Sequence, residues 1–527
     1  MKVLLIFPYV TLRMKGRPYP VEPLGLLSLA TFIRKEMAGK DIDIEILDAL
    51  FEGPDDCLET ERGFRVGMRD EQIRDRAIAF APDLVGIANN YTFNTRDVLD
   101  LAALIKATLP KATVILGGAH ATIDHENLIR YPDIDIVARG EGEETLKEVI
   151  LAMADGKDMS GVLGITWKTG EEAHINDDRP LIPDINTLPI PDRGLIPYQS
   201  YLEKTSGHYF HTMNSPIGTV FTSRGCPFKC IFCSTQRVWR NKWRPRSAEK
   251  MIEEVEYLVN EYGVKEIAFQ DDQFMGDKER IKAFCRLVLA RNLKLTFITP
   301  PGISPSLIDN ETMDLMRKAG FYRICFSIDV GTEEARRFVR KPLKLGSVRS
   351  LIRNANAKGF WTYGTFVIGF PHEKAEDILE TIKYAYGLKL DYVIFYIALP
   401  HMGSDLYDMY LKDGLIDAQD VYVSHMPDEC LFGTRHLSGK EVEALRDSAA
   451  QGYMRFHLRH FLNPAYVLRE FLPKICTPRR LMYSLRAFLL LSRSIRHTFS
   501  STAERGVTSG RKAGQAPEFR TQKQESS

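Results

Sequence analysis

The run Arg224-Gly225-Cys226-Pro227-Phe228-Lys229-Cys230-Ile231-Phe232-Cys233 places three cysteines within eight residues. The spacing is C-x-x-x-C-x-x-C, and no fourth cysteine lies nearby in the chain. Structural zinc sites and closed iron–sulfur clusters use four protein ligands. Three thiolates can instead bind three irons of a four-iron cluster and leave the fourth iron open to a small molecule. The run therefore predicts that Cys226, Cys230 and Cys233 are ligands of an open 4Fe–4S cluster rather than three incidental thiols.

The same run resembles the cluster loop of the radical S-adenosylmethionine (SAM) enzymes. The resemblance implies that SAM chelates the open iron and that an electron from the cluster cleaves it to methionine and a 5′-deoxyadenosyl radical. This radical then removes a hydrogen atom from the substrate. Phe232 matches the family position whose aromatic ring lies beside the adenine of SAM. Because no second group of three cysteines exists, we expect one cluster and structural roles for Cys285, Cys325, Cys430 and Cys476.

Length and composition set the class of protein. The chain has 527 residues, enough for two or three domains, and 44% of them are apolar. A formal net charge of +1 gives no overall support for a nucleic-acid partner, so none is expected. The first seven residues indicate a buried strand rather than a signal peptide, and no uncharged apolar run is long enough to span a bilayer. Eight cysteines in this length do not form a disulfide framework, and thiolate cluster ligands suit a reducing cytoplasm.

Residues 1–180 are predicted to form an open α/β domain. Short apolar runs alternate with stretches of helical periodicity such as 24–37 and 98–109. Strands that alternate with helices predict a Rossmann-like, doubly wound parallel sheet, whose ligands bind at the carboxyl ends of the strands. The predicted strands are Val3–Phe7, Ile42–Leu47, Leu84–Ala88, Thr113–Leu116 and Ile134–Ala138.

The loops after these strands resemble those of the cobalamin-binding domain that precedes many radical SAM cores. The resemblance rests on Pro23-Leu24-Gly25-Leu26-Leu27, Gly117-Gly118-Ala119-His120-Ala121-Thr122 and Arg139-Gly140-Glu141-Gly142-Glu143. The first strand is not followed by the Asp-x-His-x-x-Gly motif that supplies a lower cobalt ligand, and His120 is expected to be a hydrogen-bonding loop residue. The predicted cobalamin contacts are Asn89, Asn90, Gly117, Gly118, His120, Ala121, Thr122, Gly140 and Glu141.

After a proline-rich linker over residues 181–212, the alternation of strands and helices resumes in residues 213–420. Helical stretches at 248–262 and 278–290 separate two pairs of these strands. Six βα units predict the partial, TIM-like (β/α)6 barrel of the radical SAM family, with its chemistry at the carboxyl ends of the strands. The predicted strands are Thr219–Thr222, Val264–Gln270, Leu293–Ile298, Tyr322–Ile328, Trp361–Ile368 and Tyr392–Ala398.

Polar residues at these strand ends are predicted to bind SAM. Asp271 and Asp272 end the second strand, where carboxylates can accept hydrogen bonds from the SAM amino group. Ser327 and Asp329 resemble the family's Gly-Val-Glu-Ser-Gly sequence, with aspartate in place of glutamate, and imply a contact with the ribose or methionine part. Gly369 resembles the glycine of the turn that contacts adenine. Nearby, Arg340 and Lys341 could pair with the SAM carboxylate, but a solvated charge pair is the simpler expectation.

Residues 421–499 are predicted to be a helical C-terminal extension and residues 500–527 a disordered tail. Nine Lys or Arg residues and one acidic residue lie between Lys474 and Lys512, around the apolar run Ala487-Phe488-Leu489-Leu490-Leu491. A helix that packs on the barrel and exposes its arginines is the simpler interpretation. A basic amphipathic helix can also rest on an anionic membrane, which would fit a lipid-like substrate.

The order of the two resemblances, over roughly residues 1–420, implies a cytoplasmic cobalamin-dependent radical SAM enzyme. The leading hypothesis is methylation of an unreactive carbon of a small biosynthetic intermediate, with electrons from a flavodoxin- or ferredoxin-type donor. The cofactors are then a 4Fe–4S cluster, SAM and cobalamin; no catalytic residue is identified. One alternative is a radical oxidation or cyclisation, as in the anaerobic cyclase of chlorophyll synthesis, which this organisation also resembles. A non-catalytic cobalamin or redox sensor is the other.

Overall fold

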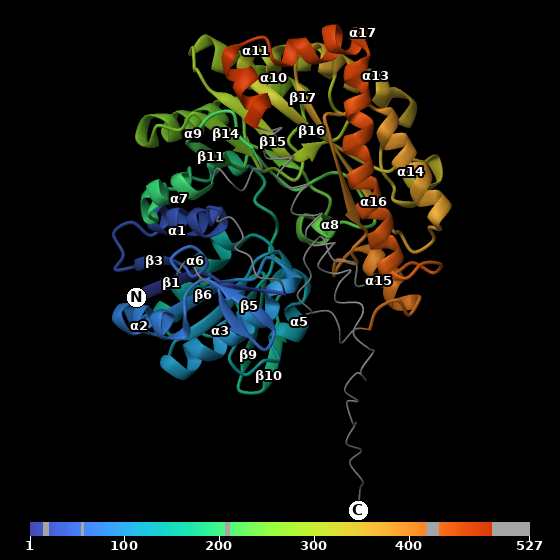
Figure 1. The fold of residues 1–527 in the computed structure, drawn as a ribbon. Coiled ribbons are helices and arrows are strands. Elements are labelled where there is room, and N and C mark those ends of the chain that lie inside the picture. The colour runs from blue at the N-terminus through green and yellow to red at the C-terminus, as the bar shows by residue number, and fades with distance from the viewer. Residues whose placement is uncertain (14–20, 54–56, 206–210, 418–431, 487–527) are drawn as a thin grey trace, which may run out of the picture. The chain divides into compact units, whose positions relative to one another are not determined.

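The computed structural model describes residues 1–13, 21–53, 57–205, 211–417 and 432–486. The predicted tail, Cys430 and the apolar run at 487–491 lie outside these residues. Residues 1–474 form one compact unit, and the described residues of a second unit begin at Ile475. The α/β class predicted for the chain is confirmed, with a doubly wound domain followed by a partial barrel (Figure 1).

The first sheet has seven strands, of which five are parallel as predicted. Their order across the sheet is β3 (Asp43–Asp48), β1 (Lys2–Phe7), β6 (Leu84–Ala88), β7 (Thr113–Gly117), β8 (Ile136–Ala138), β9 (Ile165–Thr169) and β10 (Glu172–Ile175). The antiparallel strands β9 and β10 were not predicted. They form a hairpin whose turn uses Gly170 at a φ of +60°, where glycine avoids the steric cost of a side chain.

Helices cover both faces of this sheet (Figure 1). Val3 and Leu5 pack on one face with α1 and α6, whereas Leu4 and Ile6 pack on the other with α2 and α3. Successive side chains of a strand point to opposite faces, so a strand covered on both sides needs an unbroken apolar run. The helices are α1 (Leu24–Glu36), α2 (Asp70–Phe80), α3 (Thr95–Thr108), α4 (Ala119–Ile123), α5 (His125–Leu128) and α6 (Gly142–Ala154). A small antiparallel sheet contains β2 (Val10–Leu12), β5 (Gly63–Val66) and β4 (Leu58–Thr60).

The predicted linker is a packed part of the structure rather than an extended spacer throughout. It contains short 3-10 turns at Ile185–Thr187 and Arg193–Leu195, and helix α7 (Tyr198–Thr205). The fully buried Arg193 lies 2.7 Å from Glu254 of the barrel and 3.6 Å from Glu22, which precedes α1. Glu22 also accepts hydrogen bonds from the Tyr198 hydroxyl and the Thr219 N–H. The linker thus joins the first domain to the barrel through buried charges.

The barrel sheet has six parallel strands in chain order, as predicted. They are β11 (Ile217–Val220), β14 (Glu266–Phe269), β15 (Thr296–Ile303), β16 (Phe321–Asp329), β17 (Trp361–Ile368) and β18 (Tyr392–Ile397). The first strand ends before Thr222, because the Thr222 N–H donates to Asp271 instead of to the sheet. β15 extends beyond its predicted end, and its register shifts between Thr299 and Ile303, where two prolines cannot donate hydrogen bonds.

The helices outside the barrel strands include α9 and α10, whose predicted bounds are confirmed. The set is α8 (Thr235–Trp239), α9 (Ala248–Tyr262), α10 (Lys278–Ala290), α11 (Asn310–Ala319), α12 (Glu333–Phe338), α13 (Leu345–Ala357), α14 (Ala375–Gly387) and α15 (Asp405–Lys412). A two-stranded ladder pairs β12 (Ser223–Arg224) with β13 (Arg244–Pro245).

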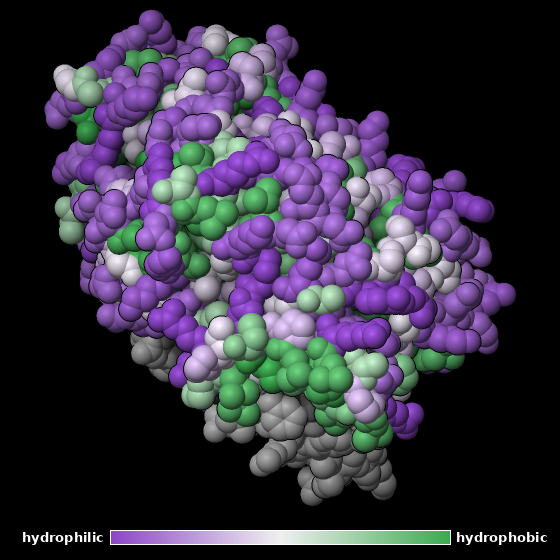
Figure 2. Space-filling model, turned by 90° about the horizontal axis from the view of Figure 1, so that it is seen from above, coloured by the Kyte–Doolittle hydropathy of each residue, from purple (hydrophilic) through white to green (hydrophobic). Residues whose placement is uncertain are grey.

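The described part of the C-terminal region is mostly helical. It contains α16 (Gly439–Leu458), α17 (Pro464–Tyr466), a π-helical turn (Val467–Phe471) and 3-10 turns at Arg459–Leu462 and Leu472–Lys474. In the second unit, residues 478–486 are helical. The face of the molecule in Figure 2 is largely hydrophilic, with apolar side chains gathered in patches.

Candidate functional site

The cysteine loop follows β11 at the carboxyl end of the barrel, and backbone contacts hold it on both sides. The Ile231 N–H donates to the Val339 carbonyl at 3.3 Å, and the Leu406 N–H donates to the Ile231 carbonyl at 2.8 Å. Gly225 begins the loop with a φ of +83°, and a Cβ added there would lie 2.1 Å from the Lys242 carbonyl oxygen. Only glycine can therefore make this turn without moving the neighbouring chain.

The three predicted cluster ligands lie in this one loop. Burial raises the pKa of Cys226 to about 12 and that of Cys230 to about 11, and the negative charge of the other thiolates adds to the rise. The Cys233 sulfur lies 3.0 Å from the Thr235 hydroxyl. A cationic cluster would remove the cost of ionising these buried thiols, because metal binding deprotonates its ligands.

Among the described residues, no three Cys, His, Asp or Glu side chains converge on a point that suits a single metal ion. A four-iron cluster does not require such a point, since each thiolate binds a different iron. The donor chemistry of the loop therefore fits the cluster, and Cys226, Cys230 and Cys233 stay its predicted ligands.

The two adjacent aspartates at the end of β14 differ in their surroundings. Asp271 is buried, and its Oδ1 accepts hydrogen bonds from the Thr222 N–H and hydroxyl and from the Ser223 hydroxyl. Asp272 is exposed to solvent. Neighbouring atoms nevertheless desolvate its carboxyl and, together with the charge of Asp271, raise its pKa to about 6. Of the two predicted SAM contacts, Asp272 is the one whose side chain a ligand can reach.

The end of β16 is strained and carries a buried ion pair. Asp329 has a φ of +65°, a left-handed conformation that is uncommon outside glycine and often marks functional sites. Its carboxylate binds the Lys341 ammonium and accepts a 3.0 Å hydrogen bond from the Thr365 hydroxyl. The expectation that both residues of the 340–341 pair are solvated is wrong for Lys341, whose side chain is 7% exposed. It holds for Arg340, whose side chain is 52% exposed and pairs with Asp405. Ser327 remains partly accessible beside this pair.

The turn predicted to contact adenine is held by a buried carboxylate. Glu373 accepts hydrogen bonds from the Gly369 and Phe370 N–H groups at 2.7 and 2.9 Å. Gly369 has a φ of +84°, and its carbonyl accepts a hydrogen bond from Tyr410. The ring of Phe370 lies 6.2 Å from that of Phe232, so two aromatic side chains from different loops meet beside the cysteines.

The predicted cobalamin loops meet at the carboxyl end of the first sheet. Gly118 has a φ of +120°, and a Cβ there would lie 2.4 Å from Asn90 Oδ1. Thr122 joins the two loops, because its hydroxyl donates to the Gly118 carbonyl and accepts from the Gly140 N–H. Gly140 is in a left-handed conformation, with no atom within 4 Å of an added Cβ.

Other side chains at this edge are consistent with a polar ligand. The Asn89 amide is fully buried with no hydrogen-bond partner among the described residues, while Asn90 is exposed. His120 is 3.1 Å from the Thr92 hydroxyl, and burial lowers the pKa of its imidazole to about 4, so it is neutral at pH 7. Gly117 is partly exposed, whereas Ala121 is buried in close packing. The orphaned amide and the glycine cradle fit a large amide-bearing group such as cobalamin.

Glu141 makes a different contact from the one predicted. Both of its carboxylate oxygens are bound by arginines of the barrel, Arg224 and Arg244, at 2.6 Å each. Its role as a cobalamin contact stays a prediction, whereas its contact with the cysteine loop is direct. Sequence reasoning gave no role to Arg224 or Glu373 and expected Lys341 to be solvated; only Arg224 gave a signal, because it lies two residues before Cys226.

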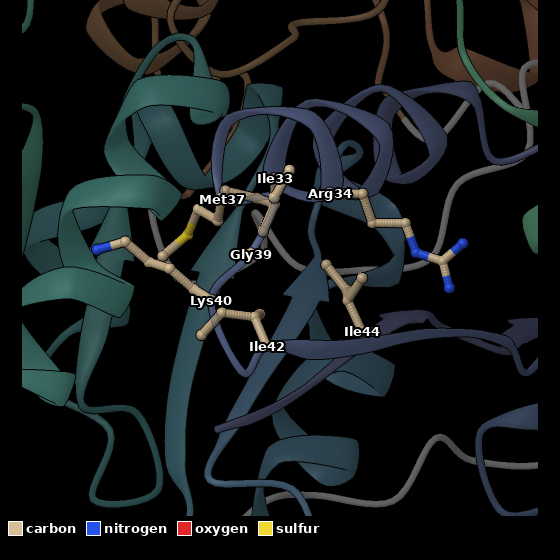
Figure 3. A pocket seen from close by; sticks show the side chains of 8 residues that line it. Ile33, Arg34, Met37, Gly39, Lys40, Ile42 and Ile44 are labelled. Carbon is tan, nitrogen blue, oxygen red and sulfur yellow. The ribbon is translucent and has the colours of Figure 1, made fainter.

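A cavity of about 220 Å³ lies at the opposite edge of the first sheet, and Figure 3 shows the side chains that line it. It is lined by the end of α1 and the start of β3, including Met37, Lys40 and Ile42. This is the amino end of the parallel strands, away from the predicted cofactor loops. Within the described residues, no helix is long and apolar enough to cross a bilayer.

Two family models match the chain in the predicted order. Residues 12–150 match the B12 binding domain, and residues 220–385 match the radical SAM superfamily. An uncharacterized methyltransferase of Pyrococcus horikoshii is 30% identical over 463 residues, which are 87% of this chain and 93% of the relative. Cytidylyl-2-hydroxyethylphosphonate methyltransferase of Streptomyces wedmorensis is 28% identical over 450 residues, 80% of this chain and 83% of that protein.

Anaerobic magnesium-protoporphyrin IX monomethyl ester cyclases also match, at 25% to 27% identity. The fold is similar to that of the radical SAM methyltransferase TsrM from Kitasatospora setae, solved with cobalamin and a [4Fe-4S] cluster bound. The TM-score is 0.62 at 18% identity, covering 78% of this chain and 75% of that one. The chain therefore belongs to the radical SAM superfamily, as a cobalamin-dependent member in which a B12-binding domain precedes the radical SAM domain.

Proposed function

We propose that this enzyme transfers a methyl group to an unreactive carbon atom of a small molecule. The observation that carries the proposal is that the helix beginning in one predicted cobalamin loop packs against the helix that follows the cysteine loop. Helix α4, which begins at Ala119, packs against α8, which begins two residues after Cys233. Gly403, after β18, approaches the same helix, since a Cβ there would lie 2.9 Å from Ile123.

The residues of the chain have separate tasks in this reaction. When bound, the cluster supplies the electron that cleaves SAM, and cobalamin supplies the methyl group. Cys226, Cys230 and Cys233 would hold the cluster, and Asp272 and Ser327 would orient the polar end of SAM. The Gly369 turn and Phe232 would hold its adenine. Such positioning places the reacting atoms together and keeps water from the radical.

A labelled methyl group distinguishes methyl transfer from its main alternative. We would incubate the anaerobically reconstituted enzyme with hydroxocobalamin, a chemical reductant, trideuteriomethyl-SAM and a small-molecule extract. Methyl transfer predicts a product that carries the deuterium label, together with 5′-deoxyadenosine. An oxidation or cyclisation predicts 5′-deoxyadenosine and an unlabelled product, and a non-catalytic sensor predicts no 5′-deoxyadenosine. The first result is expected, because the relatives that match most of this chain include two methyltransferases.

We also propose a low-potential flavodoxin- or ferredoxin-type protein as the electron donor, since the cluster needs single electrons. The membrane contact and lipid-like substrate stay predictions. They rest on the predicted basic segment, much of which lies outside the described residues. Binding to anionic vesicles, abolished by deleting residues 475–527, is the expected result; the deletion keeps Lys474, which is buried against Asp391. No binding at low salt would contradict the prediction.

A further inference from the structure

A cluster of four charged residues joins the predicted cobalamin edge to the cysteine loop, and we call it the Arg224 cluster: Arg224, Arg244, Glu141 and Glu143. The Arg224 guanidinium spans both glutamates, with its Nη1 2.6 Å from Glu141 and its Nη2 in contact with Glu143. Glu143 also accepts a 2.9 Å hydrogen bond from the Ser28 hydroxyl of α1.

The second arginine completes the cluster from the other strand of the small ladder. Arg244 Nη1 lies 2.6 Å from Glu141 Oε2 and donates to the Ile182 carbonyl. The Ile182 N–H in turn donates to Glu141 at 2.7 Å. Because Arg224 and Arg244 are cross-strand partners in β12 and β13, the two arginines form one rigid pair.

The glutamates are deeply buried, at 2% and 3% exposure, whereas the two arginine side chains are 21% and 11% exposed. Burial opposes ionisation of Glu143, but the charge and hydrogen bonds of Arg224, with that of Ser28, hold its pKa below the usual range. Buried ion pairs contribute little net stability after desolvation, and their best-attested use is to specify geometry.

The Arg224 cluster connects one predicted cobalamin loop directly to the start of the cysteine loop. Glu141 and Glu143 border the start of α6, directly after Gly140, whose N–H bonds Thr122 of the other cobalamin loop. Arg224 is followed at once by the Gly225 turn and by Cys226. A displacement of the loop at 139–143 must therefore move the beginning of the cysteine loop.

We propose that Glu141 and Glu143 are positioning residues, which hold Arg224 so that a ligand at the cobalamin edge orders the cysteine loop. The inference rests on the proposed function, because it takes cobalamin as the ligand of that edge. Coupling between two sites is reciprocal, so a filled cluster loop also strengthens cobalamin binding.

Hydrogen exchange of the full-length, cluster-free protein, with and without hydroxocobalamin, tests the coupling without any turnover. In the wild type, hydroxocobalamin is expected to protect the peptides that cover residues 117–122 and also those that cover 222–233. In Glu143→Gln, which leaves the predicted cobalamin contact Glu141 in place, protection of 117–122 remains and protection of 222–233 is lost. Arg291→Gln is the matched control, because it removes the surface pair of Arg291 with Glu256, which involves neither loop, and it should behave as wild type.

A second measurement uses the same Glu143→Gln variant, whose fold is checked by its unfolding temperature. The dissociation constant of hydroxocobalamin is compared between cluster-loaded and cluster-free protein. We expect the ratio to be about 5 to 150 in the wild type, a typical coupling, and to fall toward one in Glu143→Gln. A merely structural role would lower the unfolding temperature and leave the ratio unchanged, which would overturn the proposal.

The outcomes separate this inference from the proposed function. Wild-type protein that binds hydroxocobalamin without protection of 222–233 overturns the coupling alone. Wild-type protein that does not bind hydroxocobalamin overturns both the cofactor assignment and the coupling. Equal protection of 222–233 in wild type and in Glu143→Gln shows that another contact carries the signal, and also overturns the proposal.

Discussion

Replacing Lys341 by methionine should destabilise the protein far more than replacing its neighbour Arg340 by glutamine. Both residues form an ion pair with an aspartate, but the two pairs differ in burial. The side chains of Lys341 and Asp329 are 7% and 10% exposed, whereas those of Arg340 and Asp405 are 52% and 32% exposed. Lys341→Met leaves the Asp329 carboxylate buried with only the Thr365 hydrogen bond to compensate it.

The magnitudes follow from burial. Removing one partner of a buried pair costs about 3–5 kcal/mol, which changes the unfolding equilibrium constant by roughly two to four orders of magnitude. The exposed pair contributes at most about 1 kcal/mol. The double variant Asp329→Asn/Lys341→Met should recover much of the loss, because it leaves no unpaired charge. Asparagine also tolerates the left-handed backbone at position 329.

Equilibrium urea unfolding of the cluster-free protein, followed by circular dichroism, measures all four proteins under one set of conditions. The expected order of unfolding midpoints is wild type and Arg340→Gln highest, the double variant next, and Lys341→Met lowest. The reasoning would be refuted if Lys341→Met and Arg340→Gln had equal midpoints. It would also be refuted if the double variant were no more stable than Lys341→Met.

Three further predictions concern the cofactor loops. Cys226→Ala should abolish the iron content and the visible absorbance of the reconstituted cluster. Cys476→Ala, which changes an exposed thiol, should retain both. A full cluster in Cys226→Ala would contradict the ligand assignment. Gly118→Ala should weaken hydroxocobalamin binding about tenfold or more, because it adds about 1–3 kcal/mol of backbone strain. Gly161→Ala is the control and should bind as wild type, because its Cβ has open space. Equal binding by the two variants would argue against a glycine cradle. Burial raises the pKa of Glu373 from 4.5 to about 7, so its contribution to stability is present below pH 4.5 and is lost as the pH rises through 7. The melting temperatures of wild type and Glu373→Gln should therefore be similar below pH 4.5, and the wild type should fall below the variant as the pH rises through 7. Curves of melting temperature against pH that stay parallel would count against this carboxyl as the cause.

Much of the fold could be predicted because parallel strands that are covered on both faces require continuous apolar runs. The carboxyl ends of those strands then gave the candidate site, since consecutive strands of a parallel sheet deliver their loops to the same edge. The β9–β10 hairpin escaped prediction because Trp167 and Lys168 do not form an apolar run, and antiparallel edge strands need none.

Contacts between distant residues could not be predicted from a single sequence. Arg224 and Glu141 are 83 positions apart, and nothing local indicates that they meet. Asp271 and Asp272 are adjacent and chemically identical, so only the structure distinguishes the carboxylate that holds β11 from the one that a ligand can reach. The burial of Lys341 depends on the strained backbone of Asp329, which local propensity does not favour.

The buried charges of the linker also bear on how such a protein can be divided or recombined. A fragment that begins at the barrel would keep Glu254 and lose Glu22, and one that ends after the first sheet would lose Arg193. The first cut leaves Glu254 with Arg246 but without Arg193, and the second leaves Glu22 without Arg193. A gene fusion that exchanges one half for a homologue's must therefore supply a glutamate or arginine that matches the charge retained in the other half.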